Sequence, residues 1–294
     1  MRRLLTSIAL LLAGTGCATN LSTLQSAETL KPMQVRPAIG GGIYLPVGQV
    51  QETKALADEE AANLQAVQDG TGGTPPDAAT QRRIIELAAS LAVLTPAPVA
   101  QGGLRLGLAE GFDVGFAWST SSWRIDGKLR LRGGEGKGVH VALLAGYELY
   151  TFDVRLFELD QYLQQDISMI FDYVSLDSPQ RHDFDLRLLL SGKIAKLFVP
   201  YAALEYRVGI YSLPLTLTYT LPPPAAPFVH EEDLKGTLHY GGVMGGLAFG
   251  PKMVRLYVEV HAGYAYAPST VYGEAAELGG LAVFPAAGLA LTLF

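Results

Sequence analysis

The chain has 294 residues, of which 49% are hydrophobic and only 17% are charged. This composition excludes a disordered or collagen-like protein and is sufficient for a large core. The formal net charge is −6 and the basic residues form no block, so the sequence has no footprint for nucleic-acid binding. After the first 16 residues no apolar run reaches the length of a membrane-spanning helix, and the hydrophobic residues are spread out as in strands.

The N-terminus has the pattern of an export signal. A basic start is followed by an apolar run over 4–13 and by small residues before Cys17, the single cysteine. Residues 1–16 are therefore predicted to be a signal peptide. The segment resembles a bacterial lipoprotein signal, which implies that Cys17 is lipidated and that Ala18 after it favours sorting to the outer membrane. Ordinary cleavage that leaves a free thiol is the alternative.

Alternation of apolar and polar residues with a period of two dominates from Gln34 onward. The ten alternating segments are 34–47, 101–109, 112–119, 122–132, 138–153, 182–193, 199–219, 236–249, 252–267 and 280–294. Short connections at 110–111, 133–137, 194–198 and 250–251 all fall at one end, and long ones at 48–100, 154–181, 220–235 and 268–279 fall at the other. The sequence thus predicts an all-β fold, an antiparallel up-and-down barrel of about ten strands over 34–294, preceded by a periplasmic linker over 17–33.

Residues 48–100 are predicted to form a helical insertion after the first strand. The stretches 52–68 and 79–94 have helical spacing, and a run of glycine, proline and aspartate separates them. One face of the second helix collects apolar residues, namely Ile84, Leu87, Ala88, Leu91 and Leu94. The insertion is either an element that lies on a membrane or plugs the barrel, or a helical hairpin packed over one mouth.

The alternation over 101–132 is regular enough to derive the register of three strands. The apolar faces match only if the first connection has three residues and ends in Gly111, the preference of a type I turn followed by a left-handed residue. Trp118 then faces Trp123 across a tip at 120–121. On the opposite face these registers form two cross-strand rows, Gly107 with Asp113 and Lys128, and Arg105 with Gly115 and Asp126.

Opposite charges meet in both rows. Since Gly115 has no side chain, Arg105 is expected to lean over it towards Asp126, while Asp113 meets Lys128 directly. Two further arginines extend the same face. The predicted charge network therefore contains Arg105, Asp113, Asp126, Lys128, Arg124 and Arg130.

A period of two does not by itself say which face is inside, because a soluble barrel is apolar inside and a membrane barrel is apolar outside. The export signal and the width of the apolar face favour a polar interior. So do the aromatic residues near the long connections, as in an interfacial girdle: Trp118, Trp123, Tyr150, Tyr211, Tyr264 and Tyr266. The sequence therefore predicts a transmembrane barrel whose lumen is filled by paired charges.

The hairpin over 103–115, followed by Asp126-Gly-Lys128, resembles one that recurs in small, uncharacterised bacterial outer-membrane β-barrel proteins, some of them lipoproteins. The stretches 17–20 and 24–30 resemble the lead-in to the first strand of such proteins. The chain also ends in Phe294, like many outer-membrane barrels, although Leu289, Leu291 and Leu293 are out of phase with it. The resemblance implies an architecture and no particular activity.

We therefore expect an outer-membrane β-barrel protein, lipid-anchored through Cys17, with a structural or small-solute pore role. Its expected partners are outer-membrane lipid and the barrel-assembly machinery; no nucleic acid, cofactor or metal is expected. The sequence does not indicate an oligomeric state.

Two alternatives remain. A periplasmic lipoprotein with a soluble barrel or sandwich that binds an apolar ligand would carry Arg105 and Lys128 on its outside. An outer-rim hydrolase would use His182 with Asp183 and Asp185. Because successive strand residues point to opposite faces, His182 and Asp183 do not face each other, and we assign no catalytic residue.

Overall fold

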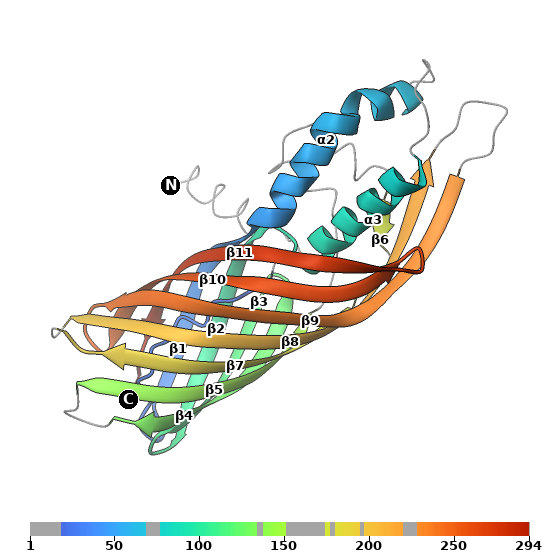
Figure 1. Ribbon diagram of the computed structural model, residues 1–294. Coiled ribbons are helices and arrows are strands. Elements are labelled where there is room, and N and C mark those ends of the chain that lie inside the picture. The colour runs from blue at the N-terminus through green and yellow to red at the C-terminus, as the bar shows by residue number, and fades with distance from the viewer. Residues whose placement is uncertain are drawn as a thin grey trace, which may run out of the picture.

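The computed structural model describes residues 19–68, 77–133, 138–150, 174–176, 180–194, 197–219 and 228–293 (Figure 1). Within these ranges the chain forms two helices and a sheet of eleven strands. The predicted signal peptide, Cys17 and Phe294 lie outside the described residues, as does most of the predicted connection 154–181.

Ten of the strands close into an antiparallel barrel, as predicted. Their order is β8-β7-β5-β4-β3-β2-β1-β11-β10-β9, and β8 pairs with β9 to complete the ring. The strands of the ring are β1 (Val35–Pro46), β2 (Ala97–Ala109), β3 (Phe112–Ser119), β4 (Ser122–Arg132), β5 (Val139–Tyr150), β7 (Gln180–Gly192), β8 (Phe198–Tyr219), β9 (Phe228–Phe249), β10 (Val254–Val271) and β11 (Glu274–Leu291). The short β6 (Val174–Leu176) pairs with β8 beyond the end of β7.

The register of β2, β3 and β4 is the predicted one. Asp113 lies opposite Gly107 on one side and Lys128 on the other, and Trp118 lies opposite Trp123. Gly111 has a φ of +82°, the left-handed conformation that the tight β2–β3 connection requires.

The last three strands, β9 to β11, extend further at the helix end than predicted. The expected long connection at 268–279 is wrong, because β10 and β11 continue as a paired ribbon to a two-residue turn at Tyr272 and Gly273. Both turn residues have positive φ, +53° and +75°, as a type I′ hairpin turn requires. The expected connection at 220–235 is likewise shortened, because β9 already begins at Phe228 and pairs with the end of β8.

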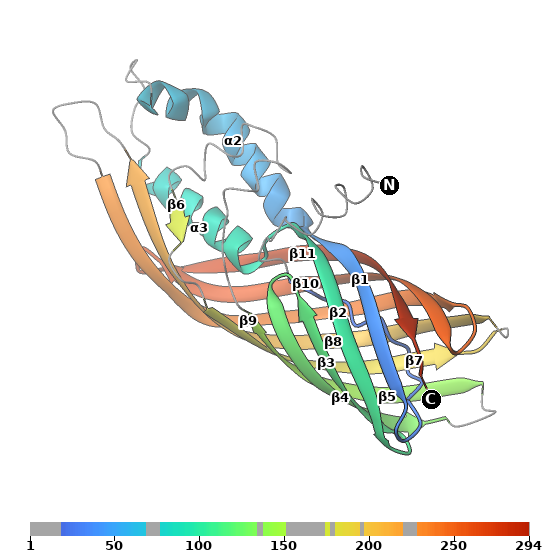
Figure 2. The same cartoon turned by 180° about the vertical axis from the view of Figure 1, so that it is seen from behind.

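The helices α2 (Val47–Gln68) and α3 (Ala78–Val93) lie where β8–β11 continue past the barrel (Figures 1 and 2). Asp77 caps α3 by accepting a hydrogen bond from the backbone N–H of Thr80 at 2.8 Å. The predicted apolar face of α3 is buried, and Ile84, Ala88 and Leu91 belong to one apolar cluster with residues of the extended strands. The extensions are stabilised because α3 covers their apolar inner side.

The outer face of the barrel is apolar. Large hydrophobic side chains on it are about half exposed, including Leu104, Phe116, Ile125, Leu186 and Val243. Trp118, Trp123, Tyr264 and Tyr266 also lie there, but the prediction for Tyr150 and Tyr211 is wrong: both are buried, because they share the inward phase of the charged positions. None of the described helices is long and apolar enough to cross a membrane.

Candidate functional site: the charged lumen and the segment inside it

Charged side chains line the inside of the barrel, where none of them is more than 8% exposed. They occupy the inward positions of the strands, alternating with the apolar residues of the outer face. Eight are cations and seven are anions: Arg36, Arg105, Arg124, Lys128, Arg181, Arg187, Arg207 and Arg255, and Asp113, Asp126, Glu148, Asp183, Asp185, Glu205 and Glu259. Charges buried to this extent need partners, since bulk water does not reach them.

The structure brings five of the six predicted network residues together. Arg105 forms ion pairs with both Asp113 and Asp126. Lys128 lies with its Nζ 3.6 Å from a carboxylate oxygen of Asp113. Arg124 lies 3.4 Å from Asp126, measured between Nε and Oδ2, and its Nη2 donates a hydrogen bond of 2.8 Å to Asp185.

The sixth predicted residue, Arg130, lies apart from this cluster. Its guanidinium pairs with Glu110 at 2.9 Å, at the connection between β2 and β3. Arg130 follows Lys128 on the same face of β4, but that face has reached the end of the barrel there. The alternation of the sequence and the strand register therefore place Arg130 on the inward face of β4. They do not show where along the strand the lumen ends.

A second group of ion pairs continues the network across β5, β7 and β8. Each of its arginines has at least one carboxylate within 3.2 Å. The pairs are Arg181 with Asp183, Arg187 with Asp185 and Glu205, and Arg207 with Glu148 and Asp183. Arg124 joins the two groups through Asp185, so the paired charges extend around much of the wall.

The lumen also contains part of the chain itself. The sequence predicts a periplasmic linker over 17–33; the structure instead places its described part among the lumen side chains, with a turn at 31–33. We call residues 19–31 the lumen segment. Thr19 accepts a hydrogen bond from Arg181, which also donates to the last residue of α3, so the segment starts at the helix end of the barrel. It finishes at the opposite end, where the N–H of Met33 donates to Gly107.

Side chains of the wall hold the lumen segment at intervals along its length. Arg207 and Arg187 donate to the carbonyls of Asn20 and Leu21 at 3.0 and 2.6 Å. Lys128 donates to the carbonyls of Ser26 and Glu28 at 3.2 and 2.8 Å. Asp113 accepts from the N–H of Leu30 at 3.0 Å. The buried charges thus satisfy backbone groups that would otherwise be stranded away from water.

The segment also makes side-chain contacts with the wall. Glu28 forms an ion pair with Arg255, so that the acids of wall and segment together equal the eight lysine and arginine side chains in number. Ser22 donates to Glu259. Apolar residues recur at every third position and are at most 3% exposed: Leu21, Leu24, Ala27 and Leu30.

Glycines of the wall give the segment room. A Cβ on Gly40 would lie 2.6 Å from a methyl carbon of Leu24, and one on Gly288 would meet the same side chain. A Cβ on Gly107 would overlap the carbonyl of Lys31. The sequence places Gly107 in the inward row, but it does not show that the missing side chain makes way for a distant part of the chain.

His261 links two acids of the wall and is itself fully buried. Its Nδ1 lies 3.0 Å from Glu205 and its Nε2 lies 3.1 Å from Glu259. The carboxylate of Glu259 also accepts hydrogen bonds from Ser22 and, at 2.8 Å, from Tyr201. Because both ring nitrogens face carboxylates, a doubly protonated imidazolium can donate to both acids at once.

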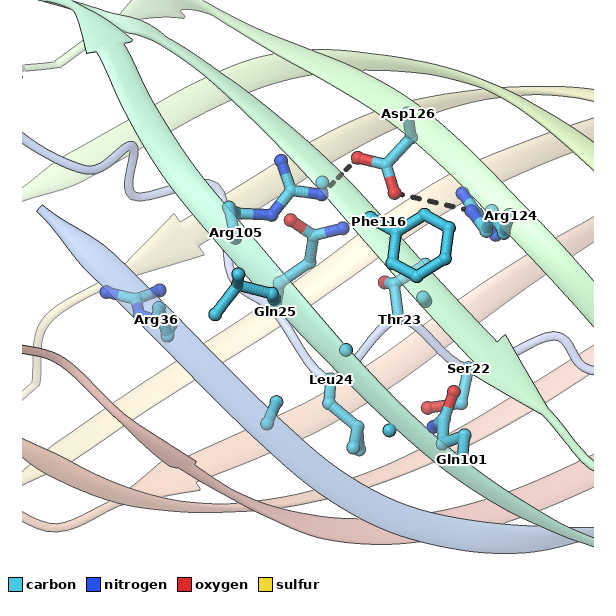
Figure 3. Close-up of a pocket in the computed structure, with 16 residues that line it drawn as sticks. Ser22, Thr23, Leu24, Gln25, Arg36, Gln101, Arg105, Phe116, Arg124 and Asp126 are labelled. Carbon is cyan, nitrogen blue, oxygen red and sulfur yellow. Dashed lines mark hydrogen bonds and ion pairs between the residues drawn. The ribbon is translucent and has the colours of Figure 1, made fainter. Parts of the chain in front are cut away.

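A cavity of about 50 Å³ remains between the lumen segment and the wall formed by β1 to β4 (Figure 3). Several polar atoms around it are buried and have no hydrogen-bond partner among the described residues. They are Nη1 of Arg36 and of Arg124, Nε2 of Gln101, Oγ1 of Thr23 and Oε1 of Gln25. The volume is enough for a few water molecules, and the polar lining suits them.

These positions bear on the two alternatives. Arg105 and Lys128 lie inside, contrary to the arrangement that a soluble barrel with an apolar interior needs. His182 and Asp183 lie on opposite faces as predicted, and the imidazole is 2.7 Å from the hydroxyl of Tyr147 on the outer side. No group of three or more metal-ligating side chains occurs in the part of the chain that the structure describes.

No family model and no curated protein matches this chain. Among solved structures, the outer membrane protease OmpT from Escherichia coli is 10% identical over 91% of this chain and 100% of its own, with a TM-score of 0.41. Neisserial surface protein A is 9% identical over 90% of this chain and 100% of its own, with a TM-score of 0.30. The monoaromatic hydrocarbon channel CymD is 7% identical over 95% and 94% of the two chains, with a TM-score of 0.29.

Proposed function

We propose that this chain is a lipid-anchored outer-membrane β-barrel with a structural role, and that its lumen is sealed in the resting state. The observation that carries the proposal is the division of the strands into an apolar outer face and a charged inner face occupied by the lumen segment. An apolar outer face and a polar interior are the arrangement of barrels that span a membrane. The proposal includes no catalytic step.

The orientation follows from the connections. The tight β2–β3 connection and the end of β11 lie at one end, and the helices lie at the other. Since outer-membrane barrels have short periplasmic turns and longer outer loops, the helix end faces the outside in our proposal.

Fractionation of cells that make the full chain tests the membrane location. We expect the protein in the outer-membrane fraction, with heat-modifiable migration on a denaturing gel. Recovery in the soluble periplasmic fraction would refute the proposal.

Metabolic labelling with a radioactive fatty acid tests the anchor separately. The full chain should incorporate label, and Cys17→Ala should abolish it while the strands still form. Equal labelling of the two proteins would exclude Cys17 as the site.

A small-solute pore is the second candidate function. It is favoured by the polar wall and by the cavity beside the lumen segment. Planar-bilayer recordings separate the two functions: a sealed barrel gives no steady conductance, whereas a resting pore gives unitary steps.

A further inference from the structure

Backbone atoms of the lumen segment make five hydrogen bonds to charged side chains of the wall. Four carbonyls accept hydrogen bonds from Arg187, Arg207 and Lys128, and one N–H donates to Asp113. These atoms exist in any peptide, and charged side chains make strong hydrogen bonds to them. The wall therefore presents backbone-binding groups near both ends of the lumen segment.

A second set of contacts selects among peptides. The apolar residues at every third position are buried, and Gly40 and Gly288 leave space for the leucine at position 24. Arg255 binds one acidic residue, Glu28. The lumen therefore suits an extended peptide that has small or apolar residues three positions apart and one carboxylate near its C-terminal end.

The fit of the segment is incomplete in its middle part. Thr23 and Gln25 each have a buried oxygen with no hydrogen-bond partner among the described residues, and the cavity separates them from the unpaired guanidinium nitrogens of Arg36 and Arg124. Figure 3 shows these side chains around the cavity. Water in the cavity can supply these hydrogen bonds, so the middle of the segment is not held by direct hydrogen bonds from these wall side chains.

We propose that the lumen is a binding site for an extended peptide, and that residues 19–31 are its resident occupant. The segment is tied to β1, so its effective concentration at the site is high and a second peptide competes poorly until the segment leaves. The inference goes beyond the proposed structural role and needs only the folded barrel, so it is tested in detergent, independently of membrane location.

The test begins with the full chain, so that the barrel folds around its own segment. A protease recognition sequence replaces Pro32, which lies between Lys31 and Met33 in the exposed turn. After purification and cleavage, the freed piece is washed away in the highest urea concentration at which the barrel keeps its heat-modifiable migration. The probe is a synthetic fluorescent peptide with the sequence of residues 19–31, and binding is followed by fluorescence anisotropy.

We expect saturable binding to the emptied barrel and none to the uncut protein. Lys128→Met, which removes the hydrogen bonds to two carbonyls, should weaken binding at least tenfold. Arg130→Met on the same strand is the matched control and should leave binding unchanged, since Arg130 pairs with Glu110 outside the site. A peptide of the same composition with the three-residue spacing scrambled should bind more weakly.

Three results would overturn the inference. In the first, the emptied barrel keeps its fold but binds no peptide. In the second, it binds the scrambled peptide as well as the peptide of residues 19–31. In the third, the cut piece leaves only when the barrel unfolds, which would make the segment part of the folded core. None of these results bears on the outer-membrane location, which fractionation tests separately.

Discussion

The carboxylate of Asp126 is accessible to Arg105 only because residue 115, which lies between them across β3, has no side chain. A Cβ at Gly115 would lie 2.6 Å from Nη2 of Arg105 and 3.0 Å from Oδ1 of Asp126. The two charged groups are almost fully buried, so neither can turn to water if the contact is lost.

Gly115→Ala is therefore expected to lower the free energy of unfolding by about 1–3 kcal/mol, the usual range for overpacking a core position. Urea titration of the folded barrel in detergent, followed by tryptophan fluorescence, measures the change. Gly245→Ala is the control, because a Cβ there meets nothing within 4 Å. Equal stability of the two variants would contradict the role given to Gly115.

His261 makes a second prediction for a single residue. His261→Leu leaves Glu205 and Glu259 without their shared cation, and breaking a buried ion pair typically costs about 3–5 kcal/mol. His182→Leu is the matched control on the outer face, where only a hydrogen bond to Tyr147 is lost, at about 1 kcal/mol. The same urea titration compares the two variants. If His182→Leu is the more destabilising change, His261 does not have the stabilising role given to it here.

At the scale of elements, α3 stabilises the part of the sheet that projects beyond the barrel. Leu91 is fully buried in the cluster between α3 and the extended strands. Leu91→Ala should cost about 2–5 kcal/mol, as other large-to-small core changes do. The loss should be local, since the barrel strands are held by their own closed hydrogen-bond ladder.

Hydrogen exchange followed by mass spectrometry locates this effect. Faster exchange is expected in the turn at 272–273 and in the adjoining ends of β8 to β11, with unchanged exchange in β2 to β5. Arg83→Ala on the exposed side of α3 should change little, because it removes a surface ion pair with Glu59. Uniform loss of protection over the whole barrel would show that α3 and the barrel unfold together.

The elements differ in how far the sequence predicts them. The register of β2 to β4 follows from local signals, namely strict alternation, Gly111 and the paired tryptophans. The sequence does not predict the ribbon of β10 and β11, because the outer part of the ribbon contains proline and alternates poorly, and because α3, which stabilises it, is far away in sequence. Nor does it predict the position of the lumen segment, because a spacing of three matches neither helix nor strand and the partners of the segment lie on distant strands.

At the scale of the whole molecule, the barrel and its occupant form one electrostatic unit. The wall alone has eight lysine and arginine side chains against seven acids, and Glu28 of the lumen segment supplies the eighth acid. Lys128 and Asp113 bind each other and the backbone of the segment, so the wall network and the occupant share the same groups. Removing the segment would leave a polar lumen with an excess of positive charge, to which an imidazolium at His261 would add.

Deletion of residues 19–31 is therefore expected to convert a silent barrel into a conducting one with a preference for anions. Planar-bilayer recordings under a salt gradient measure both properties, through the unitary current and the sign of the reversal potential. Heat-modifiable migration must first show that the deletion variant is folded; if it is not, the cut and washed full chain replaces it. The full chain is the reference, and equal currents from both proteins would mean that the segment does not close the lumen. A folded, emptied barrel without current would instead mean that the wall side chains alone are enough to close it.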